Sequence, residues 1–346
     1  MSIPKRKGPG ALKSRRRQAV TMSQEELVKT EPLEDLAMPL VVRPAADGVD
    51  LLSWAEGHQD EIERLLMEHS ALLFRGFGVQ SADAFETFAK ITSDGGLLEY
   101  RDRSTPRQAR GENVYTSTVY PADQRINLHN EGTYWRVWPL KIYFCCVTAP
   151  EAGGQTPIAN VSGVLGRIDP ALRDHFREKK IMYVRNYNDG FGLPWQEVFQ
   201  TDSRDEVEAY CRANDIEFEW KGGDRLRTRQ IRPAVRTHPK TGEEVWFNHG
   251  AFFHVTALDP QVRASLLENF AVEDLPYNTY YGDGSPIDPE DVAALFNAYD
   301  AETVAFTWEE GDVMMLNNMA VAHGRAPYKG DREVLAAMTE PYGGAA

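Results

Sequence analysis

The chain has 346 residues, a formal net charge of -14 and a pI near 5.1. This length allows one large domain or two ordinary ones, and the acidic balance argues against a general nucleic-acid or anionic-membrane surface, because the long-range field repels polyphosphate. Only three cysteines occur, which argues against a disulfide framework, and no apolar run approaches the ~20 residues of a membrane span. We therefore expect a cytoplasmic protein.

The first 22 residues form a basic segment of Lys, Arg, Gly and Pro with few apolar side chains. This composition is typical of a solvated, flexible arm. The alternative is a docking strip for an acidic partner. A serine followed three residues later by an acid then predicts a short helix that starts at Ser23.

From residue 40 onward, short strand patterns predominate and helical patterns flank them. The segment from Leu40 to Leu52 predicts a strand and then a turn. Further helices are predicted over residues 60–69, 81–91, 162–176, 205–214, 260–269 and 289–299, and further strands over 71–77, 114–120, 140–147, 218–236, 244–253, 304–308 and 312–316. We expect a mainly β fold, a decorated double-sheet barrel with flanking helices and a helical insert around residues 257–303.

The pair His129 and Glu131 is the first candidate for chemistry. On an extended strand or at its end, residues two apart point to the same side, so the imidazole and the carboxylate can converge on one ion. Two ligands are too few for tight binding. A second histidine would complete the two-histidine, one-carboxylate set of non-haem ferrous oxygenases.

The candidates for that second histidine are His238, His249, His254 and His323. We choose His323, because it follows a late apolar strand and because Arg332 comes nine residues later. A guanidinium can hold the far carboxylate of a dicarboxylate cosubstrate in a bidentate fashion.

Two further patterns bear on ligand binding. Thr156 follows a glycine pair and could donate a hydrogen bond to the same carboxylate. Arg225, Arg227 and Arg229 are spaced by two, so on a strand they share a face. They could grip a substrate carboxylate, or they could form a solvated strand face.

At this point the chain resembles the taurine dioxygenase (TauD/TfdA) superfamily of iron(II)- and 2-oxoglutarate-dependent oxygenases. The resemblance extends from about residue 20 to the C-terminus and is greatest to the SyrP-like branch, which also resembles clavaminate synthase. The motifs that carry it are His129-Asn130-Glu131, residues 153–158 (GGQTPI), residues 322–325 (AHGR) with Arg332, residues 115–118 (YTST), 226–229 (LRTR), 238–242 (HPKTG), 246–248 (WFN) and 280–284 (YYGDG).

The resemblance implies a double-stranded β-helix, or jelly roll, formed as a single oxygenase domain over residues 23–346. It implies that iron is held by His129, Glu131 and His323, and that 2-oxoglutarate is held by Thr156 and Arg332. Dioxygen would be the second cosubstrate. The substrate-binding residues that we predict from the resemblance and the arginine spacing are Ser117, Thr118, Arg225, Arg227, Arg229, Phe247 and Asn248.

Three comparisons with members of this superfamily bear on the substrate and the reaction. Residues 132–138 differ from the branch's usual pattern, which leaves the substrate open. Ala336 stands where sulfonate-binding members place a second arginine, so taurine is not expected as the substrate. Glu131 is the carboxylate that related halogenases lack, which favours hydroxylation or desaturation.

The resemblance therefore predicts hydroxylation of an aliphatic C–H bond of an amino acid in a specialised pathway, with release of succinate and CO2. The amino acid could be free or tethered to a peptide-synthetase carrier protein, whose acidic surface would suit the basic arm. Desaturation, cyclisation or rearrangement with the same cofactors is one alternative. A non-catalytic jelly roll that only binds a ligand is another.

Overall fold

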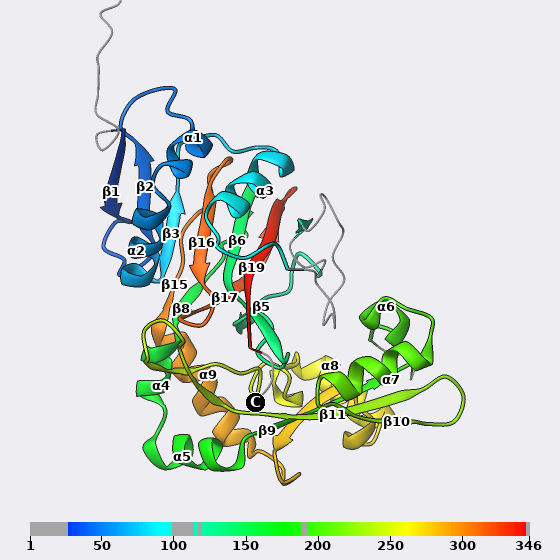
Figure 1. The fold of residues 1–346 in the computed structure, drawn as a ribbon. Helices are drawn as coiled ribbons and strands as arrows, with labels where there is room; N and C mark the ends of the chain where they lie inside the picture. Colours follow the sequence, from blue (N-terminus) through cyan, green and yellow to red (C-terminus); the bar gives the residue numbers. More distant parts are fainter. Residues whose placement is uncertain (1–26, 99–113, 117–119, 189–191, 344–346) are drawn as a thin grey trace, which may run out of the picture.

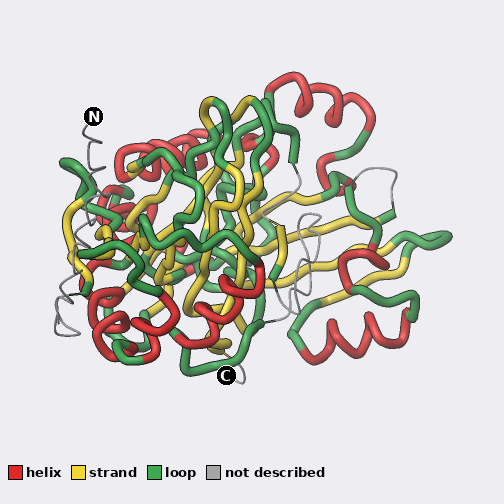
Figure 2. The backbone as a smooth tube through the Cα atoms, turned by 90° about the horizontal axis from the view of Figure 1, so that it is seen from above, coloured by secondary structure: helices red, strands yellow, loops and turns green. Residues whose placement is uncertain are grey.

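The computed structural model describes residues 27–98, 114–116, 120–188 and 192–343. The basic arm, the helix predicted at Ser23, and residues Ser117 and Thr118 lie outside this range. Strands predominate in the described part, and helices surround them (Figures 1 and 2). The fold is thus strand-rich and mixed α/β.

The largest sheet has seven strands that lie side by side in Figure 1. Its β2–β3 pair is parallel and its other pairs are antiparallel. The strand order is β1 (Val28–Pro32), β2 (Leu40–Pro44), β3 (Ala71–Phe74), β16 (Val313–Asn317), β6 (Val137–Thr148), β19 (Glu333–Gly343) and β4 (Tyr115–Thr116).

A second sheet of four antiparallel strands carries His129 and His323. Its order is β15 (Thr303–Val304), β8 (Ile158–Asn160), β17 (Val321–Arg325) and β5 (Ile126–His129). A third antiparallel sheet consists of β10 (Glu217–Trp220), β11 (Leu226–Arg232), β9 (Ile181–Tyr187) and β14 (Tyr277–Tyr281). Two short pairs are β12 (Val235–Thr237) with β13 (Glu244–Trp246), and β18 (Tyr328–Lys329) with β7 (Ala152–Gly153).

Helices flank the sheets, and the alternation of side chains along each strand determines which helices each face contacts. In β16, Val313 and Met315 belong to the core cluster that includes α1–α3, whereas Met314 and Leu316 belong to the cluster shared with the second sheet. The helices are α1 (Leu51–Glu56), α2 (Gln59–His69), α3 (Ala82–Ile91), α4 (Val161–Arg167), α5 (Pro170–Lys179), α6 (Trp195–Phe199), α7 (Arg204–Ala213), α8 (Pro260–Asn269) and α9 (Pro289–Glu302), with short 3₁₀ turns at Val255–Ala257 and Val272–Asp274.

Most predicted elements are present, and the differences have local causes. Residues 51–56 form α1 where a turn was predicted, because the Asp50 carboxylate accepts a hydrogen bond from Ser53 N at 2.8 Å and caps a helix. The single helix predicted over 162–176 is two helices, since Asp169 caps α5 and Pro170 occupies its first turn. Of the strand predicted over 244–253, only β13 is extended, and it ends at Trp246. The residues after it form irregular structure and turns.

The described part of the chain contains no helix that is both long and apolar enough to cross a membrane. All three cysteines are buried and free, as the prediction of no disulfide framework requires.

Candidate metal centre

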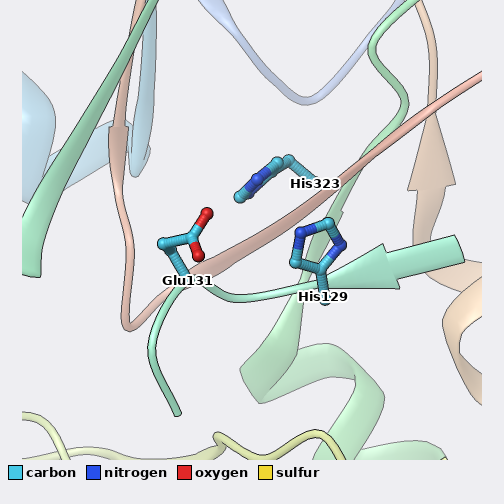
Figure 3. Close-up of side chains that lie close together, drawn as sticks. All are labelled: His129, Glu131 and His323. Carbon is cyan, nitrogen blue, oxygen red and sulfur yellow. The ribbon is translucent and has the colours of Figure 1, made fainter. Parts of the chain in front are cut away.

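Three potential metal ligands converge at one place beside the four-stranded sheet. His129 is the last residue of β5, Glu131 follows two residues later, and His323 lies in the middle of β17. One ligand atom from each residue lies within 4.8 Å of the others, and Figure 3 shows the three side chains grouped around one point. The His, Glu, His set expected from the sequence is therefore present.

Antiparallel pairing explains how residues nearly two hundred positions apart meet. His129 and His323 are cross-strand partners, and their ring centroids are 4.6 Å apart. The glycine after His323 permits this approach, because a Cβ on Gly324 would lie 2.6 Å from the backbone oxygen of Ile126. The ladder also shifts register here, between His323 and Arg325.

The hydrogen bond of His129 indicates which ring nitrogen would bind a metal. Its Nδ1 lies 2.9 Å from the backbone carbonyl oxygen of Asn127, and a carbonyl only accepts, so Nδ1 carries the proton. Nε2 then keeps its lone pair for an ion. A ligand histidine that donates its other N–H to a carbonyl is a common arrangement in metal sites.

Aromatic rings pack against the two histidines of the triad, and two of its three members are buried. The Phe144 ring lies 4.9 Å from that of His323, and the Phe252 ring lies 4.7 Å from that of His129. Glu131 is 3 % exposed and His323 4 %. Two imidazoles and one carboxylate brought together in this way form a ligand set that suits a divalent cation.

Thr156 and Arg332 lie together, as the cosubstrate hypothesis requires. Arg332 donates from Nε to Gly154 O at 3.0 Å and from Nη2 to Thr156 Oγ1 at 3.5 Å, while Trp308 Nε1 donates to the same hydroxyl at 3.0 Å. A hydroxyl that accepts two hydrogen bonds still has its own proton to donate. Burial, with a contribution from the nearby Arg325 charge, lowers the pKa of Arg332 to about 10, so it remains a cation at neutral pH.

His249, which we considered as a third ligand, lies next to the triad without belonging to it. Its ring centroid is 5.6 Å from that of His129, and it is 2 % exposed. Nδ1 forms a short hydrogen bond with Thr133 Oγ1, and the His249 backbone N–H donates to the Tyr183 hydroxyl oxygen at 2.9 Å. Burial, together with the charges of His129 and Arg185, holds the pKa of His249 well below its usual range, so it is neutral.

Of the three predicted substrate arginines, Arg227 and Arg229 share a face of the third sheet, whereas Arg225 precedes β11 and lies outside the strand. Arg227 donates to Asn186 Oδ1 at 2.8 Å and pairs with Asp274 at 2.5 Å. Arg225 donates to Gly222 O, and Arg229 lies 3.6 Å from the Glu219 carboxylate. Directly paired residues of neighbouring strands share a face of a sheet. The face opposite to Arg227 and Arg229 therefore carries Thr228 with its partner Arg185, and Gln230 with its partner Tyr183.

The remaining predicted substrate residues are buried. Phe247 is fully buried, with its ring 5.7 Å from that of Trp138. Asn248 donates to Ala234 O at 2.9 Å and accepts from Gly250 N at 2.8 Å. Ser117 and Thr118 are outside the described residues.

Sequence reasoning missed two polar residues at the site. Trp308 donates to Thr156, and only its place in a predicted late strand hinted at burial. The Asn318 side chain pairs with the backbone of Glu131, and no local sequence pattern indicated this contact.

The fold and the triad define the class of non-haem iron oxygenases. Residues 31–339 match the model of the family described as taurine catabolism dioxygenase TauD, TfdA family, and the chain belongs to this family. It is an iron(II)- and 2-oxoglutarate-dependent oxygenase with the His-x-Glu…His triad of that class. The family match and the complete triad favour an enzyme over the alternative of a non-catalytic binding protein.

Individual relatives agree with this assignment. The chain is 42 % identical over 280 residues to the dapdiamide synthesis protein DdaC of Enterobacter agglomerans, a match that covers 81 % of this chain and 85 % of that protein. It is 29 % identical to a clavaminate synthase-like protein of Arabidopsis thaliana, covering 80 % and 83 %. Among solved structures, PvcB of Pseudomonas aeruginosa, an Fe, alpha-ketoglutarate dependent oxygenase from an isonitrile synthetic pathway, superposes with a TM-score of 0.54 at 17 % identity, covering 93 % and 94 %, which supports the fold.

Proposed function

We propose that this protein hydroxylates an aliphatic C–H bond of an amino acid, free or tethered to a carrier protein, in a specialised biosynthetic pathway. The observation that carries the proposal is the identity of 42 % with a protein of dapdiamide synthesis, in a chain that has the complete triad. The presence of Glu131 keeps a carboxylate where a halogenase needs an open position for chloride. Ala336 offers no charge to a sulfonate, so taurine is not our proposed substrate.

We assign the metal to His129, Glu131 and His323, a ligand set typical of non-haem iron oxygenases. Iron held there would supply the oxidative chemistry, with dioxygen and 2-oxoglutarate as cosubstrates, for oxidation of the substrate C–H bond. The protein's own part is to hold the reactants close together and to exclude water, for which the buried setting of the triad is suited.

Thr156 and Arg332 are the proposed anchors for the far carboxylate of 2-oxoglutarate. Arg332 is a half-buried cation that directs one N–H toward Thr156, and the Thr156 hydroxyl has a proton left to donate. A carboxylate placed between them would receive charge-assisted hydrogen bonds from both.

We infer that the seven-stranded and four-stranded sheets form the double-stranded β-helix of the family. One apolar cluster joins their facing sides, with Phe144 and Leu316 from the larger sheet and Ile158 and Val321 from the smaller. We also propose that residues 23–346 act as one domain. The free cysteines fit a reducing compartment, and we propose the cytoplasm.

The predicted substrate contacts of Ser117, Thr118, Arg225, Arg227, Arg229, Phe247 and Asn248 stay part of the proposal. Arg227 already contacts the Asp274 carboxylate at 2.5 Å. A substrate carboxylate would have to compete with Asp274 for this arginine, which makes binding to Arg227 the least favourable of the three. The acidic surface of a carrier protein would suit the basic residues 1–22.

The test is succinate release from 2-oxoglutarate with ferrous iron and oxygen, across a panel of amino acids offered both free and loaded on a carrier protein. We expect iron-dependent succinate to rise with one panel member, and mass analysis to show a gain of one oxygen atom. A loss of two hydrogens instead would support desaturation. If every panel member leaves succinate at the uncoupled background while the iron site is filled, the amino-acid substrate class is wrong.

A further inference from the structure

Glu131 lies beyond the end of its strand. β5 ends at His129, so ladder hydrogen bonds of the sheet do not hold the Glu131 backbone as they hold His129. Something else must fix this segment if the carboxylate is to meet an ion at a defined point.

The side chain of Asn318 supplies those hydrogen bonds. Its Oδ1 accepts from Glu131 N at 2.8 Å, and its Nδ2 donates to Glu131 O at 2.9 Å and to Pro139 O at 2.8 Å. A backbone N–H only donates and a carbonyl only accepts, so these partners fix the orientation of the amide. The side chain thus pairs with the peptide groups of Glu131 as a neighbouring strand would.

The contact is held in place from several directions and is shielded from water. Asn130, next to Glu131, donates from Nδ2 to Asn318 O at 2.6 Å, and Asn318 N donates to Leu140 O at 2.9 Å. Both asparagines are 0 % exposed. In a buried setting, removal of one member of this network leaves other polar groups unpaired.

Asn318 also lies between two ligand-bearing parts of the chain. It follows β16, which ends at Asn317, and precedes β17, which begins at Val321 and carries His323. The same residue therefore ties the Glu131 segment to the connection that leads into the second histidine strand.

We propose that Asn318 is the positioning residue that holds Glu131 in register with His129 and His323 for metal binding. The inference rests on the proposed assignment of Glu131 as an iron ligand and does not depend on the substrate. Residues that orient metal ligands typically change metal affinity 10- to 100-fold when they are replaced.

The experiment compares Asn318→Ala with Asn317→Ala, which is a matched control. Asn317 is also buried, at 2 % exposure, and its side chain contacts His238 Nε2, Met319 N and Met67 Sδ, none of which belongs to a proposed ligand. Urea unfolding of the metal-free proteins measures stability, and calorimetric titration with Co²⁺, as a probe for the ferrous ion, measures metal affinity. We expect both variants to lose stability and only Asn318→Ala to lose affinity, about 10- to 100-fold.

Two further variants make every outcome informative. Glu131→Ala must abolish tight Co²⁺ binding; if it does not, the proposed metal centre itself is wrong. Asn318→Asp keeps the shape and the acceptor but turns the donor into an anion facing two carbonyls, so it should also lose affinity, and it replaces the alanine variant if that protein does not fold. Equal affinity losses in the Asn317 and Asn318 variants, or no loss in either Asn318 variant, would overturn the positioning role.

Discussion

At the scale of single residues, Thr156 connects the proposed cosubstrate site to its surroundings. Its hydroxyl accepts hydrogen bonds from Trp308 and Arg332, which directs its own proton elsewhere. Replacing Thr156 with Val keeps the shape and removes the donor. A hydrogen bond to a charged group contributes about 1.5–3 kcal/mol, so we expect the KM for 2-oxoglutarate to rise about 10- to 100-fold.

The measurement is succinate formation as a function of 2-oxoglutarate concentration, with Co²⁺ affinity as the control. The metal affinity should stay unchanged, because Thr156 is not among the three ligands. An unchanged KM in the Thr156→Val variant would remove this residue from the cosubstrate site.

Single residues also show how far the sequence could be used to predict the site. His129 and Glu131 share a local spacing that has chemical meaning on a strand, and His323 could be chosen from its place after a late strand. The role of Asn318 could not be inferred in this way, since its partners Glu131 and Pro139 are 187 and 179 residues away. An asparagine in a turn has a local explanation, and nothing local distinguishes it from one that orients a ligand.

At the scale of elements, a buried charged network joins α2, β6, β19 and the turn between β12 and β13. Lys141 Nζ lies 2.7 Å from the Glu63 carboxylate and 2.6 Å from that of Glu340, and Lys240 contacts the same two carboxylates. The side chains of Lys141 and Glu340 are 4 % and 7 % exposed. Such a network has little net effect as a whole, but its members depend on one another.

Replacing Lys141 with Met should therefore lower the free energy of unfolding by about 3–5 kcal/mol, because the buried Glu340 carboxylate loses the nearer of its two lysine partners. Urea denaturation at neutral pH provides the measurement. Arg64→Met is the control, since Arg64 pairs with Glu68 on an exposed helix face and should change the stability by no more than about 0.5 kcal/mol. Similar losses in both variants would contradict the buried-network argument.

The elements that sequence patterns predicted well are those with strong local signals. Helix α8 runs from Pro260 to Asn269, as predicted, because Asp259 and Pro260 mark its start. Strand β1 was missed, since four of its five residues are exposed and it has no apolar alternation. Its place in the sheet depends on pairing with β2, which is a tertiary contact.

At the scale of the whole molecule, strand order is what the sequence could least predict. In the seven-stranded sheet β16 lies between β3 and β6, so the centre of the sheet combines segments from the beginning, middle and end of the chain. Short strand patterns indicate that sheets form, but they do not state which strands pair. The family resemblance supplied what periodicity alone could not.

The stability of the whole molecule should fall in mildly acidic solution because of buried neutral histidines. Burial lowers the pKa of His254 from 6.5 to about 4, and it also lowers that of His238. The unfolded chain then binds more protons than the folded protein between pH 6.5 and about 4. The contribution of these histidines to the free energy of unfolding is therefore complete above pH 6.5 and decreases as the pH falls through this range. The decrease is at most about 1.4 kcal/mol per pH unit for each such histidine.

His254 offers a variant that isolates one of these contributions. Its Nδ1 accepts from Thr256 N at 3.3 Å and so caps the 3₁₀ turn Val255–Ala257, a role that an asparagine side chain can also fill. In urea denaturation of the metal-free protein between pH 5 and 6.5, above the range in which most carboxylates titrate, His254→Asn should show a shallower loss of stability than the unaltered protein. Both proteins retain the other histidines, so the difference in slope reports His254 alone, and equal slopes would show that its imidazole titrates alike in the folded and unfolded chains.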